Sequence, residues 1–103
     1  MNQYEVGDNL KILNNQNISC DLIYIDPPYN TGRNFGDYND KWPSMEDYSE
    51  NFLYPRFEKC HKILKDTGNI VVHVEPKNSH WIRMGLDRIF GKKRFRNEIV
   101  WKT

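Results

Sequence analysis

The sequence places a carboxylate, two prolines and an aromatic ring in succession, at Asp26, Pro27, Pro28 and Tyr29. The four apolar residues at 22–25 predict a short strand that is covered on both faces. The prolines fix two φ angles and donate no backbone hydrogen bonds, so the strand must end at Asp26. Ligands of open α/β sheets bind just beyond such strand ends. The group therefore predicts a reaction centre, and the alternative is an ordinary Pro-Pro turn with polar neighbours.

A second carboxylate precedes this strand, at Asp8. The stretch 4–13 predicts a short strand, a Gly-Asp turn and a helical turn that begins at Asn9 and directs Leu10 and Leu13 inward. A carboxylate at such a turn could lie over the adenine or ribose of a cofactor. From these residues alone, an ordinary helix cap is the simpler interpretation.

A polar segment without periodicity, residues 30–43, follows the predicted reaction centre. A loop of this length is usually functional or disordered. It interleaves positive charges with aromatic rings, which suits phosphate contact and base stacking. We expect a mobile loop that closes on nucleic acid, and the alternative is a surface loop whose Trp42 is tucked into the core.

The rest of the chain alternates between predicted helices and strands. One helix is expected to begin at Ser44, where the sequence resembles a capping box. A second helix is expected over 54–65, because Pro55 suits its first turn and Gly68 can end it. A third helix is expected over 79–90 and should stop at Gly91. Strands are expected over 69–74 and 95–101. This order implies parallel βαβ units with right-handed crossovers, in an α/β fold with a mostly parallel sheet and flanking helices.

Several other side chains could carry chemistry. Glu75 would stand on the strand end next to Asp26, and paired carboxylates can act as general acid and base. His73 within the second strand is expected to be packed rather than to bind a ligand. Cys20 and Cys60 lack metal-ligand spacing, so two reduced, buried thiols are expected and no metal site.

The length of 103 residues allows one domain. No transmembrane run or signal peptide is recognised, so a cytoplasmic protein without membrane contact is expected. Residues 1–76 carry 7 Lys or Arg against 12 Asp or Glu, whereas residues 77–103 carry 8 against 2. A basic end beside an acidic front suits a protein that meets phosphate on one side, and the alternative is a solvated helix face with a basic terminus.

The motif at residues 26–29 resembles the catalytic motif of amino-group DNA methyltransferases, which transfer a methyl group from S-adenosyl-L-methionine (AdoMet) to an exocyclic amine of adenine or cytosine. Further stretches resemble the same family in order, at 4–10, 24–32, 54–56, 86–91 and 96–102. The order resembles the permuted adenine-specific group, which includes the modification subunits of type III restriction systems. In that group the Gly-rich cofactor loop and the target-recognition region follow the catalytic half. The resemblance thus implies a partial Rossmann-like fold, with residues 1–103 as the catalytic half.

The resemblance also implies roles for individual residues. Asp26 and the carbonyl of Pro27 would accept the two N–H bonds of the target amine, and Tyr29 would stack on a base flipped out of the DNA. Asp at the first motif position points to adenine N6 rather than cytosine N4. The residues expected to contact AdoMet are Asp8, Asn9 and Asp26. Those expected to contact DNA are Asn30, Arg33, Phe35, Tyr38, Lys41, Lys92, Lys93 and Arg94.

The partners implied are double-stranded DNA with a flipped adenine, together with a second copy of the chain, a missing C-terminal part or a restriction subunit. Two other interpretations stay open. The chain could be a non-catalytic nucleic-acid-binding or dimerisation remnant of such an enzyme. It could also act on RNA bases or a protein glutamine, although such relatives usually have Asn at the position of Asp26.

Overall fold

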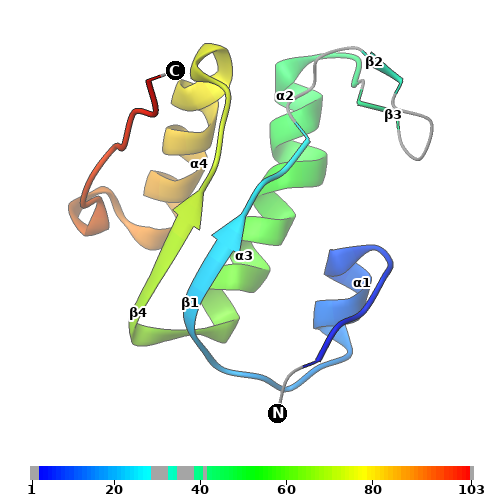
Figure 1. The fold of residues 1–103 in the computed structure, drawn as a ribbon, viewed down its shortest axis with the longest axis vertical. Coiled ribbons are helices and arrows are strands. Elements are labelled where there is room, and N and C mark those ends of the chain that lie inside the picture. Colours follow the sequence, from blue (N-terminus) through cyan, green and yellow to red (C-terminus); the bar gives the residue numbers. More distant parts are fainter. Residues whose placement is uncertain (1–2, 29–32, 35–38, 41, 103) are drawn as a thin grey trace.

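The computed structural model describes residues 3–28, 33–34, 39–40 and 42–102. At its centre lies a parallel pair of strands, β1 (Cys20–Ile25) and β4 (Leu64–Val72), as Figure 1 shows. The helix that connects them packs on the pair, so the first predicted βαβ unit is confirmed. A short antiparallel hairpin of β2 (Arg33–Asn34) and β3 (Asn39–Asp40) lies within the segment that we expected to be a loop.

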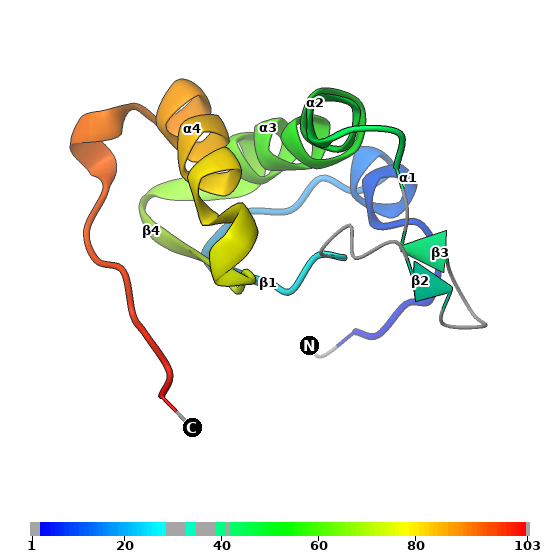
Figure 2. The ribbon, with the colours of Figure 1, turned by 90° about the horizontal axis from the view of Figure 1, so that it is seen from above.

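The helices gather on one side of the strand pair (Figure 2). Ile23 and Ile25 of β1 point to that side and are partly buried. Leu22 and Tyr24 point the other way and are 63% and 62% exposed, so the expectation that β1 is covered on both faces is wrong for the described residues. The continuous apolar run concealed this difference because alternation of side chains is invisible when every residue is apolar.

The helix that begins after Ser44 runs without interruption to residue 63. It comprises α2 (Met45–Asp47), the π-helical turn η1 (Tyr48–Leu53) and α3 (Tyr54–Ile63). The hydroxyl of Ser44 accepts a hydrogen bond from the Asp47 backbone at 3.0 Å, as the predicted cap requires. Pro55 lies in the first turn of α3, as predicted, but the expected break between two helices is absent, because η1 leads directly into α3. The π-helical pattern, in which the Tyr54 N–H bonds to the Ser49 carbonyl, spans the residues just before it.

Strand β4 begins directly after α3, at Leu64 rather than Asn69, and ends at Val72. Gly68 therefore lies inside the strand and does not end the helix. A Cβ atom at Gly68 would lie 2.9 Å from the carbonyl oxygen of Asp21, so the close approach of β1 requires glycine here. Pairing with β1 thus overrode the local helix-stop signal.

Helix α4 (Ser79–Phe90) follows the 3-10 turn η2 (Pro76–Asn78) and has the predicted bounds. It ends at Gly91, whose φ of 93° disfavours any other residue. A second 3-10 turn, η3 (Lys92–Arg94), follows. The strand expected over 95–101 does not form, because no described strand pairs with this segment and Trp101 is 87% exposed. The short strand expected near Tyr4 is absent as well, and Asp8 instead caps α1 (Asn9–Asn14).

The core lies between the long helix, α4 and the covered face of the strands. Its fully buried members are Tyr48, Leu53, Tyr54, Phe57 and Ile82. None of the helices in the described part of the chain is long and apolar enough to cross a membrane. The core therefore fixes the long helix against the carboxyl end of β1, where the predicted reaction centre lies.

Candidate active site at the carboxyl end of the strands

Asp26 lies directly after β1, as predicted, and its side chain is 56% exposed. The strand pairing extends one residue past the end of β4, because the His73 N–H donates to the carbonyl of Ile25, the last residue of β1, at 2.8 Å. The neighbour that the pairing brings to Asp26 is therefore His73. Glu75, which was expected at the neighbouring strand end, lies three residues past the end of β4 and directly before η2.

The three side chains of Tyr24, Asp26 and His73 form a polar cluster, which we call the open-face cluster. The Nδ1 atom of His73 lies 3.4 Å from the Tyr24 hydroxyl and 3.7 Å from Oδ1 of Asp26. The expectation that His73 is packed is wrong, because its side chain is 57% exposed and lies beside the exposed Tyr24. The sequence signal that could have revealed this is the two-residue alternation from Asn69 to Val74, which places the polar residues Asn69 and His73 on one face.

The Pro-Pro turn is held in place by contacts with the core. Pro27 is buried, and the carbonyl of Pro28 accepts a hydrogen bond from the hydroxyl of Tyr48. Tyr48 itself is 1% exposed. Sequence analysis assigned no role to Tyr48, for which its hydroxyl was the available signal.

Much of the predicted DNA contact set lies outside the described residues. This holds for Asn30, Phe35, Tyr38 and Lys41, and also for the aromatic motif residue Tyr29. Arg33 lies in β2, of which the backbone is described. Trp42 packs on two rings of the long helix, 4.9 Å from the Tyr48 centroid and 4.8 Å from the Phe52 centroid. The interpretation in which Trp42 joins the core is thus confirmed for this residue.

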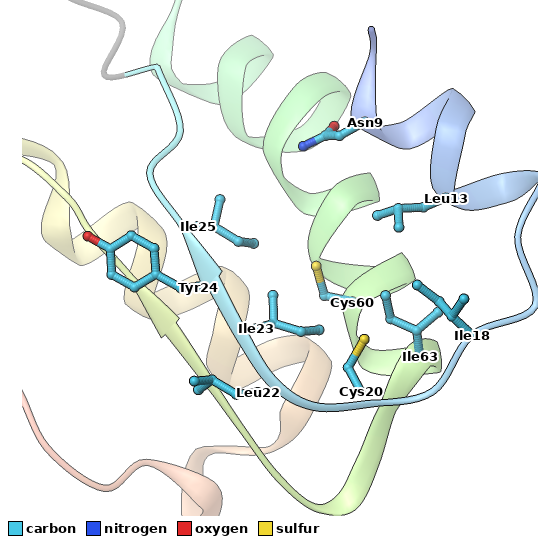
Figure 3. A pocket seen from close by; sticks show the side chains of 10 residues that line it. All are labelled: Asn9, Leu13, Ile18, Cys20, Leu22, Ile23, Tyr24, Ile25, Cys60 and Ile63. Atoms are coloured by element: carbon cyan, nitrogen blue, oxygen red, sulfur yellow. The ribbon is translucent and has the colours of Figure 1, made fainter. Parts of the chain in front are cut away.

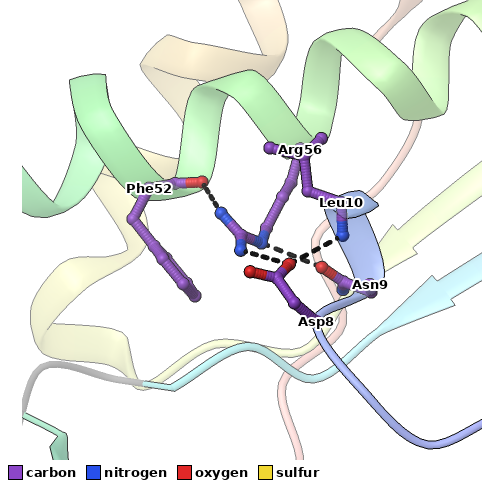
Figure 4. Close-up of polar contacts among 5 residues, drawn as sticks. All are labelled: Asp8, Asn9, Leu10, Phe52 and Arg56. Atoms are coloured by element: carbon purple, nitrogen blue, oxygen red, sulfur yellow. Dashed lines mark hydrogen bonds and ion pairs between the residues drawn. The ribbon is translucent and has the colours of Figure 1, made fainter. Parts of the chain in front are cut away.

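Asp8 and Asn9 are held together by one arginine of α3 (Figure 4). Arg56 donates from Nη2 to Asp8 and from Nε to Asn9, both at 2.9 Å. Asp8 also accepts from the Leu10 backbone at 3.0 Å, which confirms the predicted helix cap. This backbone hydrogen bond, followed by the charge of Arg56, lowers the pKa of Asp8, so the carboxylate is charged at neutral pH.

An open, mostly apolar pocket of about 320 Å³ is lined by residues of α1, β1 and α3 (Figure 3). Asn9 and Ile25 both line it, so it connects the start of α1 with the residue that precedes Asp26. Cys20 and Cys60 line it too, and both are free thiols. Burial raises the pKa of Cys60 to about 11, which keeps this thiol protonated and a poor nucleophile at neutral pH. The expected burial holds for Cys60, whereas Cys20 is half-buried.

The basic segment Lys92–Arg94 is exposed but is not gathered beside Asp26. It follows the last turn of α4, whereas the first turn of α4 comes soon after the end of β4. A helix of this length spans about 18 Å, so the two sites lie at opposite ends of α4. A DNA molecule that contacts both Asp26 and the basic segment would therefore have to extend along the length of α4.

Comparison with known proteins identifies a protein family that this chain resembles. The family model for N6/N4 DNA methylases matches residues 20–103. Similar relatives include the Mod subunit of the type III restriction-modification enzyme StyLTI from Salmonella typhimurium, 31% identical, and the type II methyltransferase M.KpnI from Klebsiella pneumoniae, 37% identical. The DNA adenine methyltransferase YhdJ from Escherichia coli is 34% identical. No solved structure matches the chain.

The alignments to these three relatives cover 98%, 92% and 81% of this chain. They cover 20%, 25% and 26% of the relatives' own lengths, so the chain spans about a quarter or less of each. The α/β arrangement of two parallel strands with flanking helices is compatible with such enzymes. Since the family match takes in both strands, the Pro-Pro turn and α4, the chain belongs to the N6/N4 DNA methylase family.

Proposed function

We propose that this chain carries the catalytic half of an AdoMet-dependent DNA methyltransferase that modifies the N6 amine of adenine. The observation that carries the proposal is the placement of Asp26. In a chain of the N6/N4 DNA methylase family, this exposed carboxylate lies at a strand end, on a Pro-Pro turn that the core tyrosine Tyr48 anchors. Cytosine N4 is the alternative target, and a protein that binds DNA without catalysis is the second candidate function.

The chemistry requires two hydrogen-bond acceptors at one nitrogen. An exocyclic amine is a poor nucleophile because its lone pair is delocalised into the ring. The carboxylate of Asp26 accepts one N–H and the carbonyl of Pro27 accepts the other, which favours tetrahedral geometry and frees the lone pair. Catalysis is then mostly positioning and electrostatics. Tyr29 stacks on the flipped adenine, since a base must leave the duplex before its amine can be reached.

The residues at the start of α1 fit the cofactor that this reaction needs. AdoMet supplies an electrophilic methyl group on a sulfonium centre and carries hydroxyl and amine donors. Asp8 offers a charged acceptor, Asn9 an amide, and the adjoining pocket an apolar wall. Arg56 holds both polar side chains in place, so little ordering would be needed on binding. Asp26 contributes a further negative charge beside the pocket end at Ile25.

The substrate and partners of the whole protein belong to the same proposal. Double-stranded DNA is the substrate, with contacts from the 30–41 segment and the exposed basic segment of η3. Target recognition and the rest of the cofactor site come from chain beyond these residues or from a second copy. A restriction subunit is a further candidate partner, since the StyLTI and EcoP15I relatives are Mod subunits of restriction-modification enzymes.

The test uses the full natural polypeptide that carries this chain. It is incubated with unmethylated DNA and labelled AdoMet, and the nucleosides are then separated and identified by mass. N6-methyladenine is the expected product, and detection of N4-methylcytosine would instead identify cytosine as the target base. Binding of DNA without any methylated nucleoside would refute the catalytic proposal and favour the DNA-binding alternative.

The role of Asp26 is tested in the same assay. Asp26→Ala should abolish transfer and leave DNA binding unchanged, because the variant removes an acceptor for the amine and no phosphate contact. Asp66→Ala is the matched control, since Asp66 is an exposed carboxylate in β4. Substantial turnover by the Asp26 variant would rule out the role assigned here.

A further inference from the structure

The open-face cluster follows from the register of the two strands. Side chains alternate along a strand, so Tyr24 and Asp26 share one face of β1 and its extension. Tyr24 pairs with Val71, and the hydrogen bond from the His73 N–H to the Ile25 carbonyl carries this register past the end of β4. His73 therefore comes to the same face as Tyr24 and Asp26, at the edge where the reaction is proposed to occur.

One nitrogen atom links the other two side chains. His73 Nδ1 lies 3.4 Å from the Tyr24 hydroxyl oxygen and 3.7 Å from Oδ1 of Asp26. In the tautomer that carries its proton on Nδ1, the imidazole can donate to the carboxylate. In the other tautomer, Nδ1 can only accept, and the Tyr24 hydroxyl is the donor within reach. Tyr24 and Asp26 thus favour opposite tautomers of the same ring.

Both distances exceed a good hydrogen bond, which is typically about 2.7–3.2 Å. Hydrogen bonds of catalytic groups are often long before the substrate binds and tighten in the complex. The side chains of Asp26 and His73 are both more than half exposed, so a small rotation can close the gap without disturbing the core.

We infer that His73 and Tyr24 are positioning residues for Asp26, an inference that rests on the proposed methyl transfer. A donor at Oδ1 fixes the rotation of the carboxylate and leaves Oδ2 to accept the N–H of the target amine. Without it, the carboxylate loses one of the contacts that orient it toward the target amine. Tyr24 holds the imidazole beside the strand end. Of the three residues in the open-face cluster, Asp26 is the one that touches the reacting amine, so His73 acts through it.

The first experiment needs no catalysis. In protein labelled with ¹⁵N, the imidazole shifts report the tautomer of each histidine. Asp26→Ala should move His73 toward the Nε2–H tautomer, because the acceptor for Nδ1–H is gone. Tyr24→Phe should move it the other way. The two other histidines, His61 and His80, are internal controls that should not move. Unchanged His73 shifts in both variants would overturn the inference.

The second experiment measures kcat and KM in the full natural polypeptide. His73→Ala should lower kcat about tenfold, which corresponds to about 1.4 kcal/mol, and leave KM for AdoMet and DNA unchanged. His73→Asn should retain most of the wild-type kcat, since its amide nitrogen can lie close to the position of Nδ1. His73→Gln places its amide near the position of Nε2 and should behave like the Ala variant.

The outcomes separate this inference from the proposed function. Wild-type kcat in His73→Ala, or equal losses in the Asn and Gln variants, would overturn the positioning role while methyl transfer stands. A wild-type protein without transfer would refute the proposed function, and the imidazole shifts would still decide whether the cluster is coupled. Thermal unfolding of each variant controls for folding, since His73 lies outside the buried core.

Discussion

The surroundings of a single carboxylate come from three parts of the chain. Asp26 follows β1, His73 follows β4, and Tyr48 of the long helix donates a hydrogen bond to the Pro28 carbonyl of the turn. Only Asp26 among these was recognised from sequence as a functional residue, because a carboxylate before two prolines is a local pattern. His73 and Tyr48 gain their roles from contacts that are 47 and 20 residues away along the chain, which no local pattern encodes.

The anchor at Tyr48 can be tested by removing one oxygen atom. Tyr48→Phe keeps the ring in the core but leaves the Pro28 carbonyl without this donor. We expect a loss of about 1 kcal/mol in the free energy of unfolding, measured by urea denaturation. In the full natural polypeptide kcat should fall, because the turn then holds Asp26 less rigidly.

Tyr4→Phe is the matched control for this change. The Tyr4 side chain is 89% exposed, so the same atom is removed without cost to stability. Equal stability of the Tyr48 and Tyr4 variants would mean that the hydrogen bond to Pro28 contributes nothing, and that packing alone holds the turn.

Among the elements, α3 and α4 pack directly against each other. The two helices approach closely because Gly85 of α4 faces the ring of Tyr54. The Tyr54 hydroxyl also donates to the Trp81 carbonyl at 2.7 Å, and the Arg88 guanidinium lies over the same ring at 5.1 Å. The sequence predicted both helices, but it did not indicate that a glycine in the middle of α4 marks their crossing.

Gly85→Ala should therefore destabilise the fold even though alanine favours helices. The new Cβ atom would lie 2.2 Å from Cε1 of Tyr54, which forces the helices apart or the ring out of its site. We expect a loss of about 1–3 kcal/mol in the free energy of unfolding, by urea denaturation.

Met84→Ala on the same helix provides the control, since Met84 is half exposed. Its stability should be unchanged or slightly increased by the better helix propensity of alanine. A Gly85 variant as stable as this control would show that α3 and α4 do not depend on close approach at this point.

Across the whole molecule, charge and apolar surface are unevenly distributed. The basic residues of 77–103 include the exposed turn Lys92–Arg94, which follows the end of α4 that is farther from the proposed reaction centre. The uncovered face of the strands exposes Leu22, Tyr24 and Val71. The position of the basic turn and the uncovered strand face both result from how the elements are arranged. The segment 95–101, which was predicted as a third strand, pairs with none of the described strands.

The salt dependence of DNA binding tests the electrostatic part of this arrangement. Replacing Lys92, Lys93 and Arg94 together by serine should reduce the slope of log K against log salt by about 3, if each residue contacts one phosphate. The control removes the same charge from the acidic front, by serine at Lys11, Lys62 and Lys65, which are exposed on α1, α3 and β4. Equal slopes for the two triple variants would mean that η3 does not meet the DNA backbone.

The sequence by itself determined the features that depend on a few neighbouring residues. The bounds of α4, the caps at Asp8 and Ser44 and the end of β1 before Pro27 all follow from backbone restrictions and capping within a turn or two. Family membership followed in the same way, from short motifs in a fixed order. These signals are local, so they could be read without knowing the fold.

Only the tertiary structure decided the start of β4, the single covered face of the strands and the neighbour of Asp26. Each depends on register, and register is set by contacts between residues far apart in the chain. A strand also needs a hydrogen-bonded neighbour, so the β-rich composition of 95–101 could not determine its state. For the same reason His73, read as a packed residue in its own strand, became the residue beside the proposed catalytic carboxylate once β1 and β4 were paired.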